Sequence, residues 1–364
     1  PAVTCEICAE LPSSICADRT MPHSPVMPTA VTMGDPAGIG GDVTLMCWTQ
    51  RHALGLKPFF ILDDPDRLGS LARTLGLNVK VQTIKTPDEA ASIFEHALPV
   101  MPLSAEVKAV PGQSDSAAAP FVIESLDRAV DFALQDQVSA VVTNPIHKAS
   151  LYAAGFTHPG HTEYLAARAA DYTGTSVHPV MMLACAEIRV VPITIHTSLR
   201  QAIDDLTTDL IVKTAKICAA DLKENFGLTE PRLALAGLNP HAGESGNMGQ
   251  EEIEIIQPAI EILGGQGINC LGPLSADTMF HATARLSYDV ALCMYHDQAL
   301  IPIKTIDFDK GVNVTLGLPF IRTSPDHGTA YNIAGSGNAS PNSLAAALKM
   351  ATDMAGNKAH LQND

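Results

Sequence analysis

The sequence lacks long apolar runs and is short of positive charge. No uninterrupted apolar stretch approaches the roughly 20 residues that span a bilayer, so we expect a soluble protein with no membrane partner. The 23 Lys and Arg residues against 39 Asp and Glu give a formal net charge of -16. Because a field of that sign repels polyanions, nucleic acid is excluded as a partner.

The sequence also lacks a dense cysteine framework. Its eight cysteines are scattered over 364 residues, unlike the closely spaced, even sets of small secreted domains. Cys5 and Cys8 form a lone C-x-x-C with no second pair at zinc-ribbon spacing, so we interpret them as unpaired surface thiols. A reducing cytoplasm fits this cysteine usage best.

Short β-branched runs alternate with longer amphipathic stretches from Thr29 onward, which is typical of an α/β fold with a largely parallel sheet between helices. The length favours two domains with a cleft between them, preceded by an appendage over residues 1–28 rich in Pro, Ser, Cys and Met. Expected strands are Ala30–Met33, Phe59–Leu62, Ala140–Thr143, Arg189–Ile195, Arg232–Ala236 and Ala291–Met294, and expected helices include Ala119–Gln135, Leu210–Phe226 and Glu251–Leu263.

Histidines recur where the strand patterns give way to loops. His196, His241 and His296 each follow an apolar run, and His161 stands in G-H-T-E. Ligands bind beyond the carboxyl ends of parallel strands, and three imidazoles make a credible set of ligands for zinc or a similar divalent ion. Asp277 and Asp297 are candidates to orient these imidazoles, although solvated loop carboxylates are the commoner case.

Two further features concern anions and cofactors. The glycine-rich segment 34–41 follows a strand and precedes a helix, but it has no G-x-G-x-x-G and Pro36 occupies its turn. We therefore interpret it as a structural loop whose backbone could equally approach a ligand. Lys304, Asn313 and Arg322 lie on segments dense in Gly and Thr, where fixed cations suit a phosphate or a carboxylate.

Several long strings make the chain similar to a known family. They are T-M-G-D-P-A-G-I-G-G, T-N-P-I-H-K, P-G-H-T-E, L-N-P-H-A-G-E-S-G-N-M-G-Q-E-E, G-P-L-S-A-D-T, M-Y-H-D-Q and G-V-N-V-T-L-G-L-P-F-I-R-T-S-P-D-H-G-T-A. They resemble the 4-hydroxythreonine-4-phosphate dehydrogenase (PdxA) family of pyridoxal phosphate biosynthesis, and the resemblance runs from about Ala30 to the last predicted helix.

The resemblance implies an isocitrate/isopropylmalate dehydrogenase-like fold and a homodimer with metal sites shared across its interface. The outer, cofactor-binding domain would comprise residues 29–140 and 300–364, and the central domain, residues 141–299, would carry the metal ligands and the dimer interface. The family's metal ligands fall on His196, His241 and His296, and its substrate-binding residues on His161, Thr162, Lys304, Asn313 and Arg322.

A cofactor loop is implied on the same ground. The run from His327 to Gly335 resembles the superfamily loop that holds the adenosine half of the cofactor, which points to His327, Gly328, Thr329, Ala330 and Asn332. Tyr331 replaces the usual Pro, and Asn332 stands where NAD-preferring relatives carry an acidic residue. The choice between NAD and NADP is therefore left open.

The function implied is metal-dependent, NAD(P)-linked oxidation of 4-hydroxythreonine 4-phosphate to 2-amino-3-oxo-4-phosphooxybutanoate, which decarboxylates to 3-amino-2-oxopropyl phosphate. One divalent ion per site, zinc, magnesium or cobalt, would polarise the substrate hydroxyl. Lys304, Asp277 and a metal-bound water are candidates for proton transfer. The alternatives are a sister dehydrogenase acting on 4-phosphothreonate or 4-phosphoerythronate and, in another class, a zinc-dependent hydrolase or lyase.

Overall fold

The computed structural model of the protein describes residues 27–158 and 160–361. Cys5, Cys8 and most of the expected appendage lie outside these ranges. Within them, a single sheet of 12 strands has the order β3-β4-β2-β1-β5-β12-β11-β6-β7-β10-β8-β9. The strands are β1 (Thr29–Thr32), β2 (Phe59–Leu62), β3 (Val81–Thr83), β4 (Leu98–Met101), β5 (Ala140–Val142), β6 (Val180–Ala184), β7 (Arg189–Pro192), β8 (Arg232–Ala236), β9 (Asn269–Leu274), β10 (Val290–Cys293), β11 (Val312–Leu316) and β12 (Arg322–Pro325).

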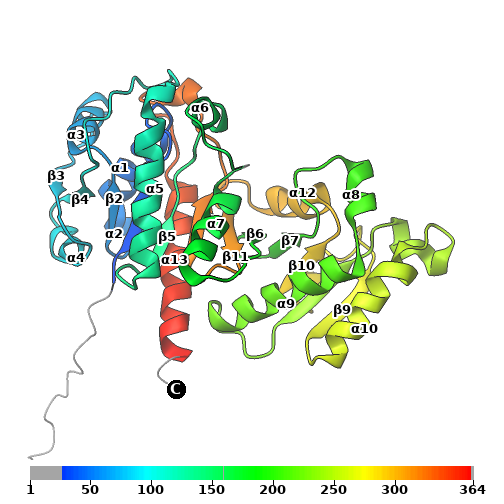
Figure 1. The fold of residues 1–364 in the computed structure, drawn as a ribbon. Helices are drawn as coiled ribbons and strands as arrows, with labels where there is room; N and C mark the ends of the chain where they lie inside the picture. The colour runs from blue at the N-terminus through cyan, green and yellow to red at the C-terminus, as the bar shows by residue number, and fades with distance from the viewer. Residues whose placement is uncertain (1–26, 159, 362–364) are drawn as a thin grey trace, which may run out of the picture.

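The sheet is largely parallel, as the sequence pattern predicts, but its centre is not. β1 to β5 pair in parallel with one another and with β12, and β7 to β10 form a second parallel set. β11 runs antiparallel to both β12 and β6, and β6 runs antiparallel to β7. The two parallel sets therefore run in opposite directions, on either side of β6 and β11 (Figure 1).

Helices cover both faces of the sheet. They are α1 (Gly40–Thr49), α2 (Arg51–Leu54), α3 (Pro65–Thr74), α4 (Glu89–Ile93), α5 (Ala119–Leu134), α6 (Lys148–Ala153), α7 (His161–Thr173), α8 (Leu199–Asp205), α9 (Thr208–Glu224), α10 (Gln257–Gly265), α11 (Ala282–Arg285), α12 (His296–Ile306) and α13 (Asn342–Leu361). None of the helices in the described part of the chain is long and apolar enough to cross a membrane.

The core follows from strand alternation. Val31 of β1 packs into a cluster with α1, α13, α9 and α10, whereas its neighbour Ala30 points to the opposite face, against α5 and α7. A third cluster joins α12 to β7, β8 and β10. Successive strand residues point to opposite faces, so this arrangement confirms the expected helix, sheet, helix layers.

Element boundaries differ from the sequence expectations where proline or a cap intervenes. The helix expected at Glu251–Leu263 is divided into a π-helical turn, η3 (Glu252–Ile256), and α10. Pro258 lies in the first turn of α10 and has no N–H to donate, which favours an irregular turn before it. The helix expected from Leu210 begins at Thr208, because the Thr207 hydroxyl accepts the Leu210 N–H at 3.2 Å.

Candidate active site

A polar cavity of about 420 Å³ gathers most of the predicted site residues. Eight of them line it: His161, Thr162, His196, His296, Asn313, Arg322, His327 and Gly328. They come from the start of α7, the loop after β7, the start of α12, β11, β12 and the loop after β12. Segments far apart in the sequence thus meet at one cavity, and three of the four histidines singled out in the sequence, His161, His196 and His296, line it.

Arg322 is a buried cation that faces this cavity, and none of the carboxylates of residues 27–158 and 160–361 pairs with it. Its Nη2 and Nε donate to the Thr143 hydroxyl at 2.6 and 3.2 Å, and its Nη1 donates to the Thr315 hydroxyl at 2.9 Å. Burial lowers the pKa of Arg322 to about 10, despite the opposing effect of Glu163. A buried guanidinium bonded only to neutral hydroxyls is suited to receive an anion.

Two other cavity residues have buried polar atoms without a partner in the described part of the chain. These are Oδ1 of Asn313 and Nε2 of His327. Since buried polar atoms are nearly always hydrogen-bonded, both positions fit a site that is completed by a ligand. Burial, followed by the positive charges of Arg322 and Lys148, holds the pKa of His161 well below its ordinary value. His161 is therefore neutral at pH 7 and can act as a hydrogen-bond donor or acceptor.

His196 and His296 lie together because β7 and β10 are parallel neighbours. The Thr194 hydroxyl donates to the Met294 carbonyl at 2.8 Å, which ties the ends of these strands together. The two imidazole rings lie 5.8 Å apart, centroid to centroid. Nδ1 of His296 pairs with Asp297 Oδ1 at 2.7 Å, and a carboxylate in that position holds the tautomer whose Nε2 lone pair can bind a metal.

His196 is also suited to metal binding. Burial, then the charge of Lys148, lowers its pKa, so its imidazole stays neutral. The orienting role predicted for Asp297 agrees with this geometry. Asp277, in contrast, is exposed and accepts the Ser275 hydroxyl at 2.6 Å.

The third predicted metal ligand, His241, is not beside the other two. It is exposed on η2 (Pro240–Gly246), which follows β8, the strand on the far side of β10. Among residues 27–158 and 160–361, no group of three His, Cys, Asp or Glu side chains could hold a metal ion. One chain by itself therefore brings two of the three imidazoles together.

Lys304 lies beside the cavity and does not line it. Its ammonium group pairs with Asp326 Oδ2 at 2.7 Å, and Asp326 itself lines the cavity. A substrate anion would therefore meet Lys304 together with a compensating carboxylate.

The loop expected to hold the cofactor packs against the glycine-rich segment 34–41. The Thr329 carbonyl accepts the Ile39 N–H at 3.0 Å, and the Tyr331 hydroxyl donates to Asp35 Oδ2 at 2.8 Å. A Cβ on Gly38 would lie 2.8 Å from the Thr329 oxygen, so this contact requires glycine. The segment is buried, as a structural loop should be, and its contacts link it to the predicted cofactor loop.

Three cavity residues were missed as candidates in the sequence, namely Thr143, Lys148 and Glu163. Thr143 follows β5 and bonds Arg322, and Lys148 begins α6. Lys148 and Glu163 both lie inside strings that carry the family resemblance, T-N-P-I-H-K and P-G-H-T-E, and that was the available signal. A lone lysine or glutamate at a helix start is otherwise an ordinary solvated residue.

Comparisons with known proteins agree on one family. The model of the pyridoxal phosphate biosynthetic protein PdxA matches residues 56–351. The chain is 51% identical over 346 residues to a 4-hydroxythreonine-4-phosphate dehydrogenase of Bradyrhizobium diazoefficiens, covering 93% of this chain and 100% of that protein. It is 54% identical over 330 residues to the protein of the same name from Methylorubrum populi, covering 90% and 94% of the two chains.

Solved structures give the same result. The crystal structure of 4-hydroxythreonine-4-phosphate dehydrogenase from Klebsiella pneumoniae superposes with a TM-score of 0.80 at 36% identity, covering 90% of this chain and 99% of that one. The Burkholderia phymatum enzyme of that name gives 0.78 at 32% identity, covering 90% and 98%. These matches confirm the α/β fold and the resemblance found in the sequence, and they do not favour the alternative functions. The chain belongs to the PdxA family of oxidoreductases, whose named members are 4-hydroxythreonine-4-phosphate dehydrogenases.

Proposed function

We propose that the protein oxidises 4-hydroxythreonine 4-phosphate with a nicotinamide dinucleotide, and that the keto acid formed loses carbon dioxide. The observation that carries this proposal is the single cavity in which an unpaired, buried Arg322 lies together with the adjacent His196 and His296. Family membership supplies the reaction. The cavity supplies the two binding functions that this substrate requires, one for an anion and one for a hydroxyl and amine.

The anionic groups of the substrate are assigned to the Arg322 side of the cavity. Arg322 donates charge-assisted hydrogen bonds, and the amide of Asn313 and the neutral imidazole of His161 complete the polar surface, with Thr162 at the start of α7. The free Oδ1 of Asn313 can accept from a substrate donor. These contacts fix the position of the reacting carbon, so that binding energy is converted into orientation.

We assign the divalent metal to His196 and His296 of one chain and His241 of a second copy. A divalent ion bound there, whether zinc, magnesium or cobalt, would polarise the substrate hydroxyl as a Lewis acid. The imidazoles fit this role because Asp297 sets the tautomer of His296 and burial keeps His196 neutral. His241 is exposed and separate from this pair, as a ligand donated to another subunit should be.

Surface composition supports a homodimer formed through the central part of the chain. Exposed large apolar side chains are concentrated between residues 199 and 308, where Leu199, Ile203, Met248, Ile253, Ile262, Leu286, Ile301 and Phe308 are each at least 42% exposed. Exposed apolar side chains concentrated in one part of a chain are typical of association sites. Asp277 follows β9, the neighbour of β8, so we assign it to the second copy's contribution together with His241.

Proton transfer and cofactor binding are assigned to the cavity's other edge. Lys304 reaches the cavity through its ion pair with Asp326 and is our candidate proton-transfer residue. His327 and Gly328 line the cavity, and the loop through Thr329, Ala330 and Asn332 holds the dinucleotide.

We retain the division into an outer domain (29–140 and 300–364) and a central one (141–299). A cytoplasmic location is supported by the five cysteines of the described residues, which are all free thiols.

The first test is turnover. Metal-stripped protein, resupplied with zinc, magnesium or cobalt, is assayed for nicotinamide reduction with 4-hydroxythreonine 4-phosphate. We expect metal-dependent reduction that is lost in His196→Ala. No turnover with any metal, accompanied by turnover of 4-phosphothreonate or 4-phosphoerythronate, would move the assignment to a sister dehydrogenase. Substrate consumption without nicotinamide reduction would indicate a hydrolase or lyase.

The shared site has its own test. His196→Ala and His241→Ala homodimers are each expected to be inactive. The two variants are then dissociated, mixed in equal amounts and reassociated. Each mixed dimer has one site with all three imidazoles and one site that lacks both His196 and His241. Because half of the dimers are mixed and each has one complete site of two, about a quarter of wild-type activity should return. Mixing His196→Ala with His296→Ala is the control and should restore none. Failure of the first mixture to recover activity would place all three ligands in one chain.

A further inference from the structure

The active-site cavity contains a second cation besides Arg322. Lys148 also lines it, and this lysine has no role in the proposed function. The proposed substrate carries an anion at each end of its carbon chain, a phosphate at one and a carboxylate at the other, with the hydroxyl and the amine between them. A site for such a molecule is best matched by two separate positive groups, and Arg322 supplies only one.

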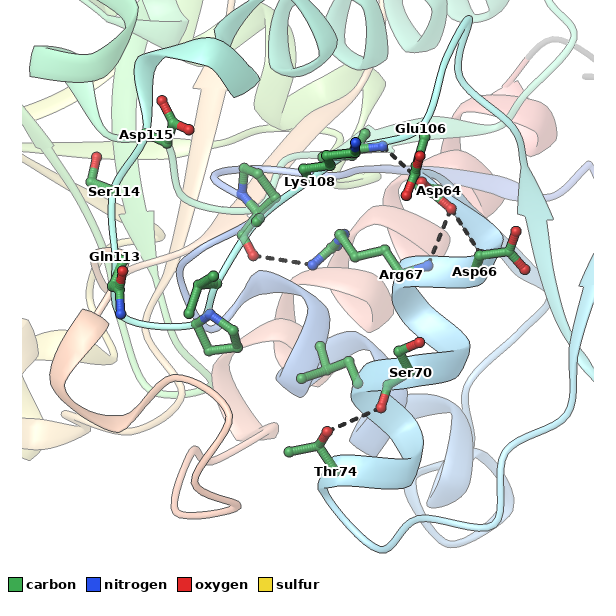
Figure 2. Close-up of a pocket in the computed structure, with 16 residues that line it drawn as sticks. Asp64, Asp66, Arg67, Ser70, Thr74, Glu106, Lys108, Gln113, Ser114 and Asp115 are labelled. Carbon is green, nitrogen blue, oxygen red and sulfur yellow. Dashed lines mark hydrogen bonds between the residues drawn. The ribbon is translucent and has the colours of Figure 1, made fainter.

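Lys148 stands at a fixed point of the chain, because the residues around it are anchored. It is the first residue of α6 and follows His147. Nδ1 of His147 bonds the Ser150 hydroxyl at 2.7 Å and the Ser114 hydroxyl at 3.1 Å. Figure 2 shows Ser114 on the segment 106–115, outside the active-site cavity. A cation at a helix start is opposed by the positive end of the helix dipole, so stability does not account for a lysine here.

The ammonium group of Lys148 lies beside Gly160, which precedes α7. A Cβ on Gly160 would lie 3.5 Å from Lys148 Nζ and 3.3 Å from Glu163 Oε2. The glycine therefore leaves open the space into which both side chains extend. The two residues that follow it, His161 and Thr162, line the active-site cavity. The ammonium group thus lies at the wall of this cavity.

The charge of Lys148 acts on a different part of the cavity from that of Arg322. Burial is the main cause of the lowered pKa of His196, and the charge of Lys148 is the next, whereas Arg322 is not among the causes. At His161, burial is followed by the charges of both Arg322 and Lys148. Arg322 therefore faces the His161 side, and Lys148 faces the metal-binding pair as well.

Lys148 also differs from Lys304 in its freedom to bind an anion. Lys304 is paired with Asp326 at 2.7 Å. None of the ion pairs formed among residues 27–158 and 160–361 includes Lys148. An ammonium group of this kind can donate charge-assisted hydrogen bonds to a carboxylate without first breaking an ion pair.

We propose that Lys148 binds the carboxylate of the substrate, and that Arg322 binds its phosphate. This inference rests on the proposed function, and it divides between two cations the anionic groups that were assigned together to the Arg322 side. The amine and the hydroxyl between these ends are left to the side of the cavity that carries His196 and His296. Lys148 is then the residue that selects a carboxylic acid over the same phosphate ester without its carboxyl group.

Two ligands that differ only in the carboxyl group test this assignment. They are 4-hydroxythreonine 4-phosphate and 3-amino-2-hydroxypropyl phosphate, which keeps the phosphate, the hydroxyl and the amine. Their dissociation constants are measured by calorimetry on the zinc-loaded protein without nicotinamide, so that binding is read in the absence of turnover. The wild type should bind the second ligand about 10- to 100-fold more weakly, because one charge-assisted hydrogen-bonded contact is missing.

Variants should separate the two cations. Lys148→Met should weaken binding of 4-hydroxythreonine 4-phosphate about 10- to 100-fold and change binding of the second ligand less than about twofold. Because Lys148 is exposed, this variant can fold normally. Arg322→Met should weaken binding of both ligands, since both carry the phosphate. Lys216→Met removes an exposed lysine from α9, outside the cavity, and is the matched control that should change neither affinity.

Equal weakening of both ligands in Lys148→Met, or no weakening of either, would overturn the proposal. Equal affinities of the wild type for the two ligands would do the same, and so would an effect of Arg322→Met confined to the carboxylate-bearing ligand. Failure of the proposed function has a different result. A wild-type protein that binds neither ligand, whether loaded with zinc, magnesium or cobalt, would refute the proposed function itself.

Discussion

Replacing Arg322 with methionine should separate function from stability. A side chain that is buried and hydrogen-bonded usually stabilises the fold, so its removal lowers stability together with activity. Arg322 is 3% exposed, and its bonds go to the hydroxyls of Thr143 and Thr315. None of the ion pairs formed among residues 27–158 and 160–361 includes it. The charge is therefore buried at a cost that no carboxylate offsets by direct pairing.

The magnitude follows from the pKa. Burial lowers the pKa of Arg322 from 12.5 to about 10, which corresponds to about 3 kcal/mol of destabilisation of the charged form in the folded state. Because the unfolded chain binds the proton more tightly, this cost is present at every pH below the folded pKa. Methionine removes it but leaves the hydroxyls of Thr143 and Thr315 without a partner, at about 1–3 kcal/mol. The free energy of unfolding of Arg322→Met should thus equal that of the wild type or exceed it by up to about 2 kcal/mol.

Activity should change in the opposite direction. Charge-assisted hydrogen bonds contribute about 1.5–3 kcal/mol each, so the loss of two from the substrate phosphate predicts a fall in kcat/KM of more than about a hundredfold. Urea unfolding gives the stability, and inorganic phosphate should raise the Tm of the wild type but not of Arg322→Met. Arg232→Met, at a surface ion pair with Asp289, is the control for removing an arginine. A loss of several kcal/mol in Arg322→Met would show that the guanidinium is a structural group and refute this reasoning.

Three further predictions concern single groups. Asp297→Asn should weaken zinc binding about 10- to 100-fold in a chelator competition, because the carboxylate at 2.7 Å orients His296; unchanged affinity would remove Asp297 from the site. His161 should titrate below pH 6.5 by NMR, and Lys148→Met should raise its pKa, because Lys148 is one cause of the shift. Since the unfolded chain alone takes up that proton, stability should fall as the pH drops below about 6.5, and a midpoint at or above that value would contradict the burial argument. Asp63→Ala should cost about 3–5 kcal/mol by urea unfolding, because it leaves Arg67 without its buried partner; a loss under about 1 kcal/mol would contradict this.

The strands and helices could be predicted from the sequence because each is encoded by a local pattern of apolar and turn residues. Strands such as Phe59–Leu62 and Arg232–Ala236 are bounded as predicted, since short apolar runs between turn residues have few other interpretations in an α/β chain. The antiparallel centre of the sheet was not predictable in this way. β6 and β11 are joined by pairing between residues more than a hundred positions apart, such as Met182 and Val314, and no local pattern encodes the direction of such a pair.

Less of the candidate site could be predicted from the sequence, because its contacts join residues that are far apart in the chain. A histidine after a strand indicates which edge of the sheet it occupies, and for His196 and His296 the neighbouring strands place the two together. The same rule puts His241 one strand away but does not give the direction of its side chain. Likewise, Lys304 has the residue type expected for an anion site, whereas its pairing with Asp326 depends on how α12 packs against the loop after β12.

The backbone around His241 explains why that side chain departs from the rule. Residues 241–245 all have positive φ, between 43° and 74°, and four of the five are not glycine. Each such residue costs roughly 1–2 kcal/mol relative to the right-handed conformation, so the segment would relax if nothing held it. Glu252, which is buried, accepts the backbone N–H of Asn239 at 2.7 Å and its side-chain amide at 2.9 Å.

The buried carboxylate of Glu252 lies against the strained segment, and the conformation of that segment decides where His241 lies. A Cβ on Gly243 would lie 2.5 Å from Glu252 Oε2, so the glycine lets the segment close over this carboxylate. The turn leaves His241 exposed, and His196 and His296 remain as a pair without it. Under the proposed shared metal site, this strained turn is the segment that presents the His241 imidazole to the other subunit.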